Sequence, residues 1–152
     1  MPLSDIFGTA GSILSVATAL PLTPTKAAYE GLTWKVVGLV SDLGSSGKTY
    51  NETTFSDIQS AKVVPRLTSS DNGEKAITYA YTAGADTGHA ELETKMGKKA
   101  AFSERMSNGK IRYFQAYVKG GAVSLGTVDN IVTQAQALRI TEDDILTETA
   151  PA

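Results

Sequence analysis

The chain has few side chains of the kinds that carry out catalysis. His89 is its single histidine, so a serine nucleophile activated by an imidazole would depend on this residue alone. His89 falls on the apolar face of an expected helix, and no serine lies in a Gly-x-Ser-x-Gly setting. The chain contains no cysteine, which excludes thiolate chemistry, disulfides and Cys-ligated metals. We therefore predict no enzymatic activity and no cofactor.

Two segments resemble ligand-binding motifs without the required spacing. Residues 44–49, GSSGKT, end in the Gly-Lys-Thr of a phosphate loop, but two residues rather than four separate the glycines. No strong helix is expected to follow and point its N-terminus at a phosphate. Residues 142–144, EDD, lack the alternating ligands and closing glutamate of a calcium loop. Neither nucleotide nor metal binding is expected.

Basic and aromatic residues alternate along residues 95–119. Half of the 14 Lys and Arg residues lie there, interleaved with Tyr113, Phe114 and Tyr117. An aromatic platform in a basic groove is how OB-type domains stack single strands, so a single-strand nucleic-acid-binding module is one hypothesis. The alternative is that Phe114 lies in the core and the bases face acidic patches of other subunits. The net charge of -2 and the pI of about 5.4 favour this alternative.

The elements that position these residues are expected to be mainly strands. A chain of 152 residues with 41% hydrophobic content fits one domain. We predict a mainly β fold, an antiparallel β-sandwich or partly closed barrel with one flanking α-helix. The boundaries are an N-terminal arm at 1–28, the domain at 29–146 and a flexible acidic tail at 147–152. The helix is expected at 86–98, and strands are expected at 32–40, 61–67, 74–82, 101–106, 110–119 and 129–140.

Turn residues set the expected strand pairing. Asn108-Gly109 predicts a tight turn between two strands, because both residues tolerate positive φ. Residues 69–73, SSDNG, predict a second hairpin that joins strands 61–67 and 74–82. Pro65 has no N–H to donate, so we expect it at an edge, a bulge or an unpaired site. Residues 41–60 are expected to form a long loop with an interaction role.

The N-terminal residues are rich in apolar side chains that a solitary domain would leave exposed. Ile13 and Leu14 are expected to dock on the body or on a neighbouring subunit, and a frayed terminus is the alternative. No base precedes the apolar run at residues 13–20, so we expect neither an export signal nor contact with a membrane.

The segment at residues 107–140 reads as a hairpin too long for a small domain to cover. One face of its second strand carries Gln134, Gln136 and Leu138, and the other carries Thr133 and Arg139. Each face therefore mixes apolar with polar groups, and neither is plainly core or plainly solvent. Small uncharged polar side chains on a long strand indicate a surface that is hydrated and that packs next to the same surface of other copies of the chain.

Three segments resemble the major tail tube proteins of long-tailed bacteriophages with non-contractile tails. These are residues 38–44 (GLVSDLG), 47–54 (GKTYNETT) and 126–132 (GTVDNIV), with Asn108-Gly109 and an aromatic strand before the last. Their order carries the resemblance, which spans residues 27–145. It implies six copies in a ring and rings stacked into a tube, whose inner wall is a continuous β-barrel that conducts genome DNA. Such closure would pair every exposed strand edge.

The resemblance also implies a location and partners. The protein would belong to the virion tail, be assembled in the host cytoplasm, and contact tape-measure, tail terminator and tail tip proteins. DNA would pass through the lumen without specific binding. A tube protein of a type VI-like secretion system or of a gene transfer agent is the alternative. Candidate interface residues are Tyr50, Asn51, Phe55, Ile13 and Leu14, and candidate lumen-wall residues are Thr78, Thr133, Gln134 and Gln136.

A lumen for DNA must not hold phosphate tightly, since each neutralised phosphate adds affinity. The arginines on the candidate wall strands, Arg112 and Arg139, conflict with this requirement. We therefore expect both to be paired or to point away from the channel.

Overall fold

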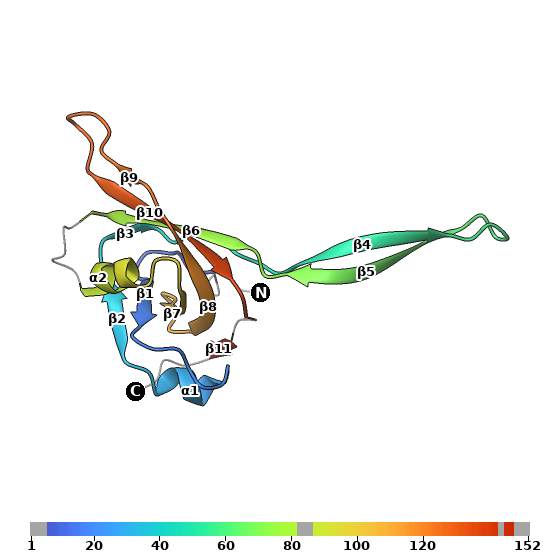
Figure 1. Ribbon diagram of the computed structural model, residues 1–152, viewed down its shortest axis with the longest axis horizontal. Helices are drawn as coiled ribbons and strands as arrows, with labels where there is room; N and C mark the ends of the chain where they lie inside the picture. Colours follow the sequence, from blue (N-terminus) through green and yellow to red (C-terminus); the bar gives the residue numbers. More distant parts are fainter. Residues whose placement is uncertain (1–5, 82–86, 143–144, 148–152) are drawn as a thin grey trace.

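The computed structural model describes residues 6–81, 87–142 and 145–147 of the chain (Figure 1). Strands dominate, and two short helices accompany them. In chain order these elements are β1 (Ile13–Ala17), α1 (Lys26–Glu30), β2 (Trp34–Val37), β3 (Val40–Asp42), β4 (Thr49–Ser56), β5 (Val63–Asp71), β6 (Glu74–Ala80), α2 (Thr87–Thr94), β7 (Lys99–Arg105), β8 (Ile111–Gly120), β9 (Val123–Ser124), β10 (Thr133–Ile140) and β11 (Ile145–Thr147).

Most strands form one curved antiparallel sheet whose two edges come close together without pairing in the described residues. Its order is β2-β1-β7-β8-β10-β6-β3, with β11 beside β8 and β9 beside β10. β2 and β3 lie at opposite edges of this order, yet only Gly38 and Leu39 separate them in the chain. Such a connection reaches about 11 Å at most, so the two edges must lie close together. The expected partly closed, mainly β architecture is therefore present.

The inside of the curved sheet holds the larger core. Phe102 and Phe114 face each other across β7 and β8 with ring centroids 5.4 Å apart. Leu92 of α2 is fully buried against this cluster, so the helix covers part of the sheet. The remaining buried members come from β1, β2, β6, β7, β8 and β10. Phe114 is thus a core residue. This agrees with the alternative to nucleic-acid binding that was given for the basic and aromatic segment at residues 95–119.

A smaller core lies on the outer face of the same strands. Tyr29 of α1 stacks on Tyr113 of β8 with ring centroids 5.2 Å apart, and Trp34 packs against the pair. The indole N–H of Trp34 donates to the carbonyl of Tyr29 at 3.1 Å. Thr25 caps α1 by accepting from the backbone N–H of Ala28. Burial raises the pKa of Tyr113, because the phenolate would lose its hydration.

The region expected to be an arm before residue 28 contributes an integral strand. β1 lies between β2 and β7 and pairs with both, and Leu14 is buried in the larger core. Leu14 therefore cannot serve as an interface residue, because its side chain is already covered by its own domain. Ile13 stays partly exposed. The short helix α1 was not expected either.

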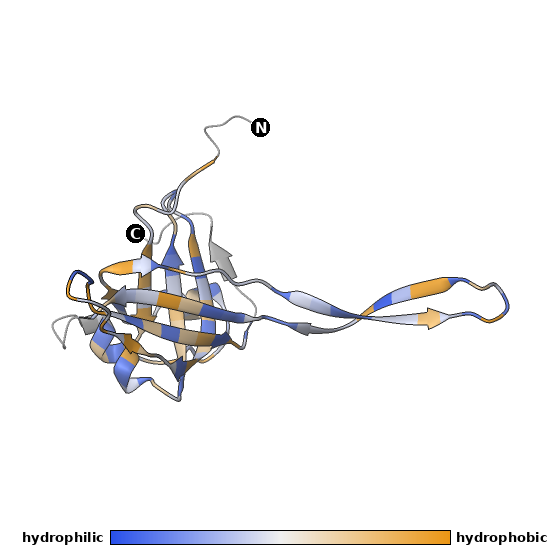
Figure 2. Ribbon diagram, turned by 90° about the horizontal axis from the view of Figure 1, so that it is seen from above, coloured by the Kyte–Doolittle hydropathy of each residue, from blue (hydrophilic) through white to orange (hydrophobic). Residues whose placement is uncertain are grey.

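The expected hairpin over residues 61–82 is wrong. β5 pairs with β4, whereas β6 pairs with β10 and β3, so the turn at 72–73 joins strands of two different sheets. The segment at 41–60, expected to be a loop, includes the end of β3 and all of β4. Together β4 and β5 form a two-stranded ribbon that projects from the body of the molecule (Figures 1 and 2).

Other expectations agree with the structure. Asn108-Gly109 lies in the turn between β7 and β8, and Gly109 has φ of 89°. α2 begins and ends within the expected helix and buries His89 and Leu92 on one face. The proposed C-terminal tail lies outside the described residues, apart from Thr147 at the end of β11.

Candidate assembly surfaces

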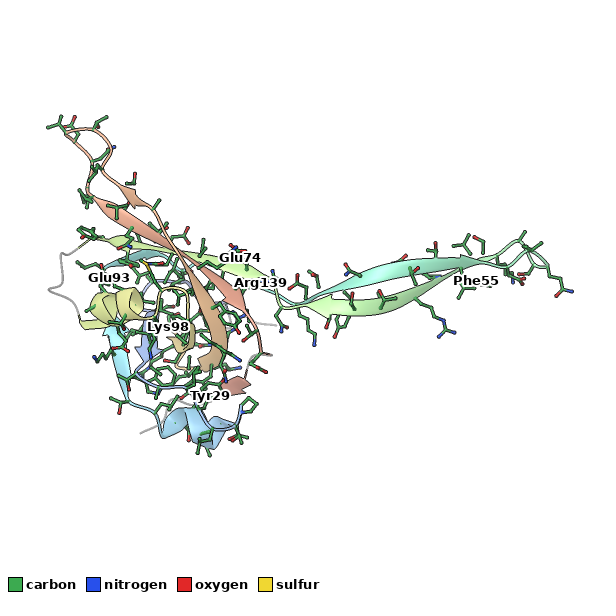
Figure 3. All side chains as sticks on the ribbon, viewed as in Figure 1. Tyr29, Phe55, Glu74, Glu93, Lys98 and Arg139 are labelled. Atoms are coloured by element: carbon green, nitrogen blue, oxygen red, sulfur yellow. The ribbon has the colours of Figure 1, made fainter. Side chains whose placement is uncertain are left out.

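The ribbon at residues 49–71 is highly exposed. It is called the arm from here on, and it is a different segment from the N-terminal arm that the sequence predicted at 1–28. Every residue of β4 and β5 is exposed, including the apolar side chains of Tyr50, Phe55, Val63, Val64 and Leu67. Ile58 at the tip is fully exposed. Figure 3 shows Phe55 near the outer end of the arm, far from the body. A two-stranded ribbon alone is marginally stable in water, and exposed apolar groups of this kind mark contact surfaces.

Hydrogen bonds give the arm a defined shape despite its exposure. The Asn51 side-chain amide donates to Ser69 Oγ at 2.9 Å, and Thr68 Oγ1 donates to the carbonyl of Asn51 at 3.1 Å. At the tip, Ser60 Oγ donates to the Asp57 carboxylate at 2.6 Å, which together with the backbone N–H of Gln59 lowers the pKa of Asp57. The ribbon therefore has a defined, hydrogen-bonded conformation within the single chain.

The arm leaves the body at a fixed position. On the β5 side, Arg139 donates two hydrogen bonds of 2.8 Å to the carboxylate of Asp71. On the β4 side, Arg112 donates to Ser46 Oγ at 2.7 Å. Gly44 has φ of 66° and approaches β6 so closely that a Cβ there would lie 2.2 Å from the Ala76 carbonyl oxygen. Both ends of the arm are thus tied to strands of the main sheet.

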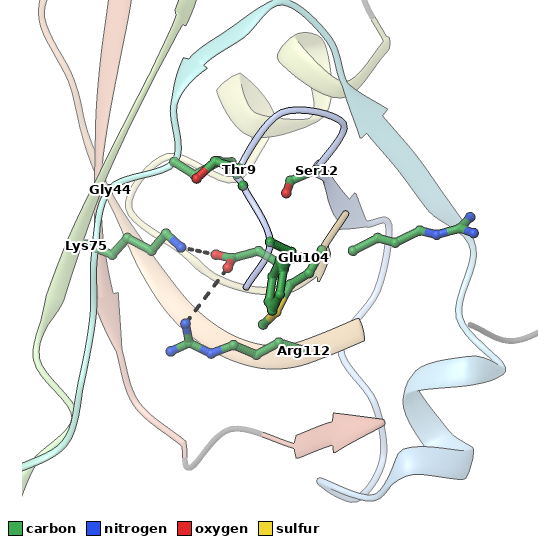
Figure 4. A pocket seen from close by; sticks show the side chains of 11 residues that line it. Thr9, Ser12, Gly44, Lys75, Glu104 and Arg112 are labelled. Atoms are coloured by element: carbon green, nitrogen blue, oxygen red, sulfur yellow. Dashed lines mark hydrogen bonds and ion pairs between the residues drawn. The ribbon is translucent and has the colours of Figure 1, made fainter. Parts of the chain in front are cut away.

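Arg112 connects the base of the arm to an ion cluster inside the body (Figure 4). Lys75 of β6 contacts Glu104 of β7 through its ammonium group, and Arg112 lies 3.8 Å from the other oxygen of the same carboxylate. The Lys75 side chain is 2% exposed, so its ammonium contacts this carboxylate in place of water. The cluster lines a cavity of about 210 Å³ beside Gly44 and Met106. It joins three strands to the segment from which the arm starts.

An uncharged surface lies on the outer face of β6 and β10. Cross-strand neighbours there are Thr133 with Ala80, Ala135 with Thr78, and Ala137 with Ala76. All six side chains are at least partly exposed. Charge enters only at the end nearest the arm, where Arg139 stands opposite Glu74. This surface, here called the alanine-threonine face, contains two of the four candidate lumen-wall residues, Thr78 and Thr133.

The other two candidates lie on the opposite face of the sheet. Gln134 and Gln136 are 4% and 0% exposed and point into the larger core. The Gln136 side-chain amide donates to the Tyr79 hydroxyl at 3.4 Å, and burial raises the pKa of that hydroxyl. Both glutamines are therefore corrected to core positions, where a lumen cannot reach them.

The interface candidates on β4 lie in the arm. Tyr50 and Phe55 are exposed, and Asn51 has its side chain engaged with Ser69. Lys48 lies over the Tyr50 ring, 5.5 Å from its centroid. The sequence located these residues but missed the strand that carries them, because β4 is mostly polar.

The basic and aromatic segment does not form a stacking platform. Tyr113 and Phe114 are buried, so only Tyr117 of the three rings is open to solvent. Several of the bases are paired with acids of the same chain, among them Lys99 with Glu142 and Lys119 with Glu74. Arg112 and Arg139 are paired too, which confirms the expectation for both.

His89 packs in the core. Its ring stacks on Tyr79 with centroids 4.3 Å apart, and its Nε2 lies 2.7 Å from the carbonyl oxygen of Gly38.

The GSSGKT segment leads into β4 and not into a helix. Within residues 6–81, 87–142 and 145–147, no cluster of acidic or histidine side chains has the arrangement of a metal site. In the same part of the chain, no helix has the length and apolar character needed to span a bilayer.

Comparison with known proteins gives a match in structure but not in sequence. No protein-family model matches the chain, and no curated protein sequence matches it. The solved structure of the SPP1 tail tube, determined by solid-state NMR and cryo-EM, superposes with a TM-score of 0.56 at 15% sequence identity. The superposition covers 92% of this chain and 78% of the SPP1 chain. The chain therefore has the fold of a siphophage tail tube protein, in agreement with the resemblance found in its sequence.

Proposed function

We propose that the protein is a structural subunit of a phage tail tube, with six copies in a ring and rings stacked into a conduit for DNA. The observation that carries the proposal is the arm, an ordered ribbon with apolar side chains that its own domain leaves uncovered. A monomer gains nothing from such a surface, whereas repeated contact between copies would bury it. The fold shared with the SPP1 tail tube supports the same function.

The alanine-threonine face suits the wall of the conduit. Short uncharged side chains would let DNA slide, because they neutralise no phosphate and release no counterions. Arg139 lies at the edge of this face, but Asp71 occupies its guanidinium. In this proposal Thr78 and Thr133 line the lumen, and the edges of the sheet pair with neighbouring copies in a continuous barrel.

Location and partners follow from this role. The protein would reside in the virion tail after assembly in the host cytoplasm. Proteins that set tail length and close the two ends of the tail would be its partners besides itself. A tube subunit of a gene transfer agent or of a secretion system would use the same surfaces for the same purpose.

Negative-stain microscopy of the purified full-length chain tests the proposal. We expect rings or tubes from the wild-type chain and dispersed particles from Phe55→Asp, which places a charge in the contact surface of the arm. Leu22→Asp is a matched control, because Leu22 is a fully exposed apolar residue of the body. Monomers at all concentrations, together with salt-sensitive binding of single-stranded DNA, would instead support a nucleic-acid-binding module.

A further inference from the structure

A second apolar projection lies in the connection between β8 and β10. Residues 121–132, here called the distal loop, expose Val128 at 98% and Ile131 at 77%, and Leu125 and Val123 are exposed as well. The loop is ordered, since Asn130 donates from its backbone N–H to the Thr127 carbonyl at 3.0 Å. Gly126, with φ of 65°, packs against the Asn130 side chain. The loop therefore holds its apolar groups in place without a partner.

The distal loop and the arm lie at opposite ends of the same strands. β10 starts at Thr133, directly after the loop and opposite Ala80. It ends beside the base of the arm, where Arg139 stands opposite Glu74 and binds Asp71. Figure 1 shows the two projections leaving the body in different directions, the arm to one side and the loop of β9 and β10 to the other.

Two different surfaces at opposite ends of a molecule allow contacts that repeat in one direction. When the end of one copy fits the other end of the next, the contact is heterologous and can continue without closing. At about 3.3 Å per residue, the eight-residue strand β4 extends roughly 26 Å, far enough to overlap a neighbouring copy.

The two surfaces also match in chemistry. Phe55 lies opposite Val64, and Thr53 lies opposite Arg66, so these four side chains share one face of the arm. In the distal loop Asp129 stands next to Val128. Within the described residues neither Arg66 nor Asp129 takes part in an ion pair. The four-residue face of the arm and the distal loop thus each combine apolar side chains with a charge outside any described ion pair, and these two charges, Arg66 and Asp129, are opposite.

We propose that the distal loop of one copy is the docking surface for the arm of a second copy. In this contact Phe55 and Val64 of one chain pack on Val128 and Ile131 of the other, and Arg66 lies beside Asp129. The inference rests on the proposed tube function and deepens it, because it assigns the contact to successive rings and not to neighbours within a ring.

Disulfide trapping tests this contact, since the natural chain has no cysteine. Phe55→Cys and Val128→Cys chains are mixed, allowed to assemble and oxidised. The expected product is a disulfide-linked pair that contains one chain of each kind. With both substitutions in one chain, an axial contact gives a ladder of linked species that continues beyond six chains.

The outcomes separate the inference from the proposed function. Tubes without a mixed disulfide would overturn the docking contact, and a ladder that stops at the number of chains in a ring would overturn its assignment to successive rings. Either result would leave the tube function intact. A chain that forms neither rings nor tubes before substitution would overturn the tube function itself.

A charge exchange gives an independent test that needs no disulfide geometry. Arg66→Asp and Asp129→Arg are each expected to raise the concentration needed for tube formation about tenfold, and the double variant is expected to recover most of this loss. Lys98→Asp makes the same charge change as Arg66→Asp at an exposed position of the body, shown in Figure 3, and is expected to assemble normally. Equal effects of Arg66→Asp and Lys98→Asp, or a double variant no better than the single ones, would contradict the pairing.

Discussion

The body and the arm carry apolar residues in opposite environments. In the body, aromatic rings such as Phe102 and Phe114 are fully buried and stacked on one another. In the arm, Phe55 and Val64 pair across two strands and remain exposed to solvent. The body therefore satisfies the requirements of folding within one chain, whereas the arm meets only the requirements of local hydrogen bonding. The difference indicates that folding and the proposed assembly depend on separate sets of residues, which substitutions can tell apart.

The largest effect is expected from the core of the body. Phe114→Ala removes a fully buried ring and should lower the free energy of unfolding by about 4 kcal/mol. That is a large part of the roughly 5–15 kcal/mol that a domain of this size has. Urea unfolding followed by circular dichroism measures the change. A loss below about 1 kcal/mol would mean that the stacked rings are not the centre of the core.

The second largest loss of stability is expected from the ion cluster at the base of the arm. Glu104→Ala leaves the buried ammonium of Lys75 without its partner and is expected to cost about 3 kcal/mol. Replacing the pair together, as Lys75→Met with Glu104→Leu, should restore most of the stability, because the fully buried ammonium is removed with its partner and the partly buried Arg112 keeps its hydrogen bond to Ser46. If the double variant is as unstable as Glu104→Ala, packing around the cavity and not charge accounts for the loss.

Substitutions in the arm should change the stability of the monomer little and its assembly strongly. Phe55→Ser combined with Val64→Ser removes exposed apolar groups, so the unfolding free energy of the monomer should change by less than about 0.5 kcal/mol. Sedimentation should nevertheless show that assembly is lost. Normal assembly by this variant would mean that the apolar face of the arm is not a contact surface.

The smallest effect concerns pH at the base of the arm. The Gly73 backbone N–H and the Arg139 guanidinium hold the pKa of Asp71 below its ordinary value of 3.8. Because the folded-state pKa is lowered, the contribution to stability is complete above pH 3.8 and is lost as the pH falls through the folded-state value. The protection factor of the Gly73 amide, which compares its exchange rate with that of an unfolded chain at the same pH, should therefore fall at low pH, while amides in β8 keep their protection. In Asp71→Asn this fall in protection should be absent, and its persistence would assign the effect to another group.

The parts of the fold that the sequence predicts depend on local signals. Asn108-Gly109 specifies its turn through backbone conformation alone, and the spacing of His89 and Leu92 places both on the buried face of α2. The general β architecture follows from such signals and from the tail tube resemblance. The missing N–H of Pro65 predicts an edge strand. The structure agrees, because β5 lies in a two-stranded ribbon in which each strand is an edge.

The parts that the sequence does not predict depend on distant partners. Thr53, Thr54 and Glu52 read as loop, and they form a strand only because β5 lies beside them. The sequence pattern predicts that Gln136 is exposed to solvent. In the structure its side chain is buried in the core, where the hydroxyl of Tyr79 from another strand accepts its hydrogen bond. The alanine-threonine face was found only in part, since the alternation of β10 identifies two faces without telling which one meets the core.

Cryo-EM of the chain assembled from purified protein tests most directly whether copies of the body form a tube and cover the arm. The account predicts rings of six chains, a channel lined by the alanine-threonine face, and each arm in contact with a second copy. A folded chain that forms no tube, or a tube in which the arms project freely into solvent, would contradict it.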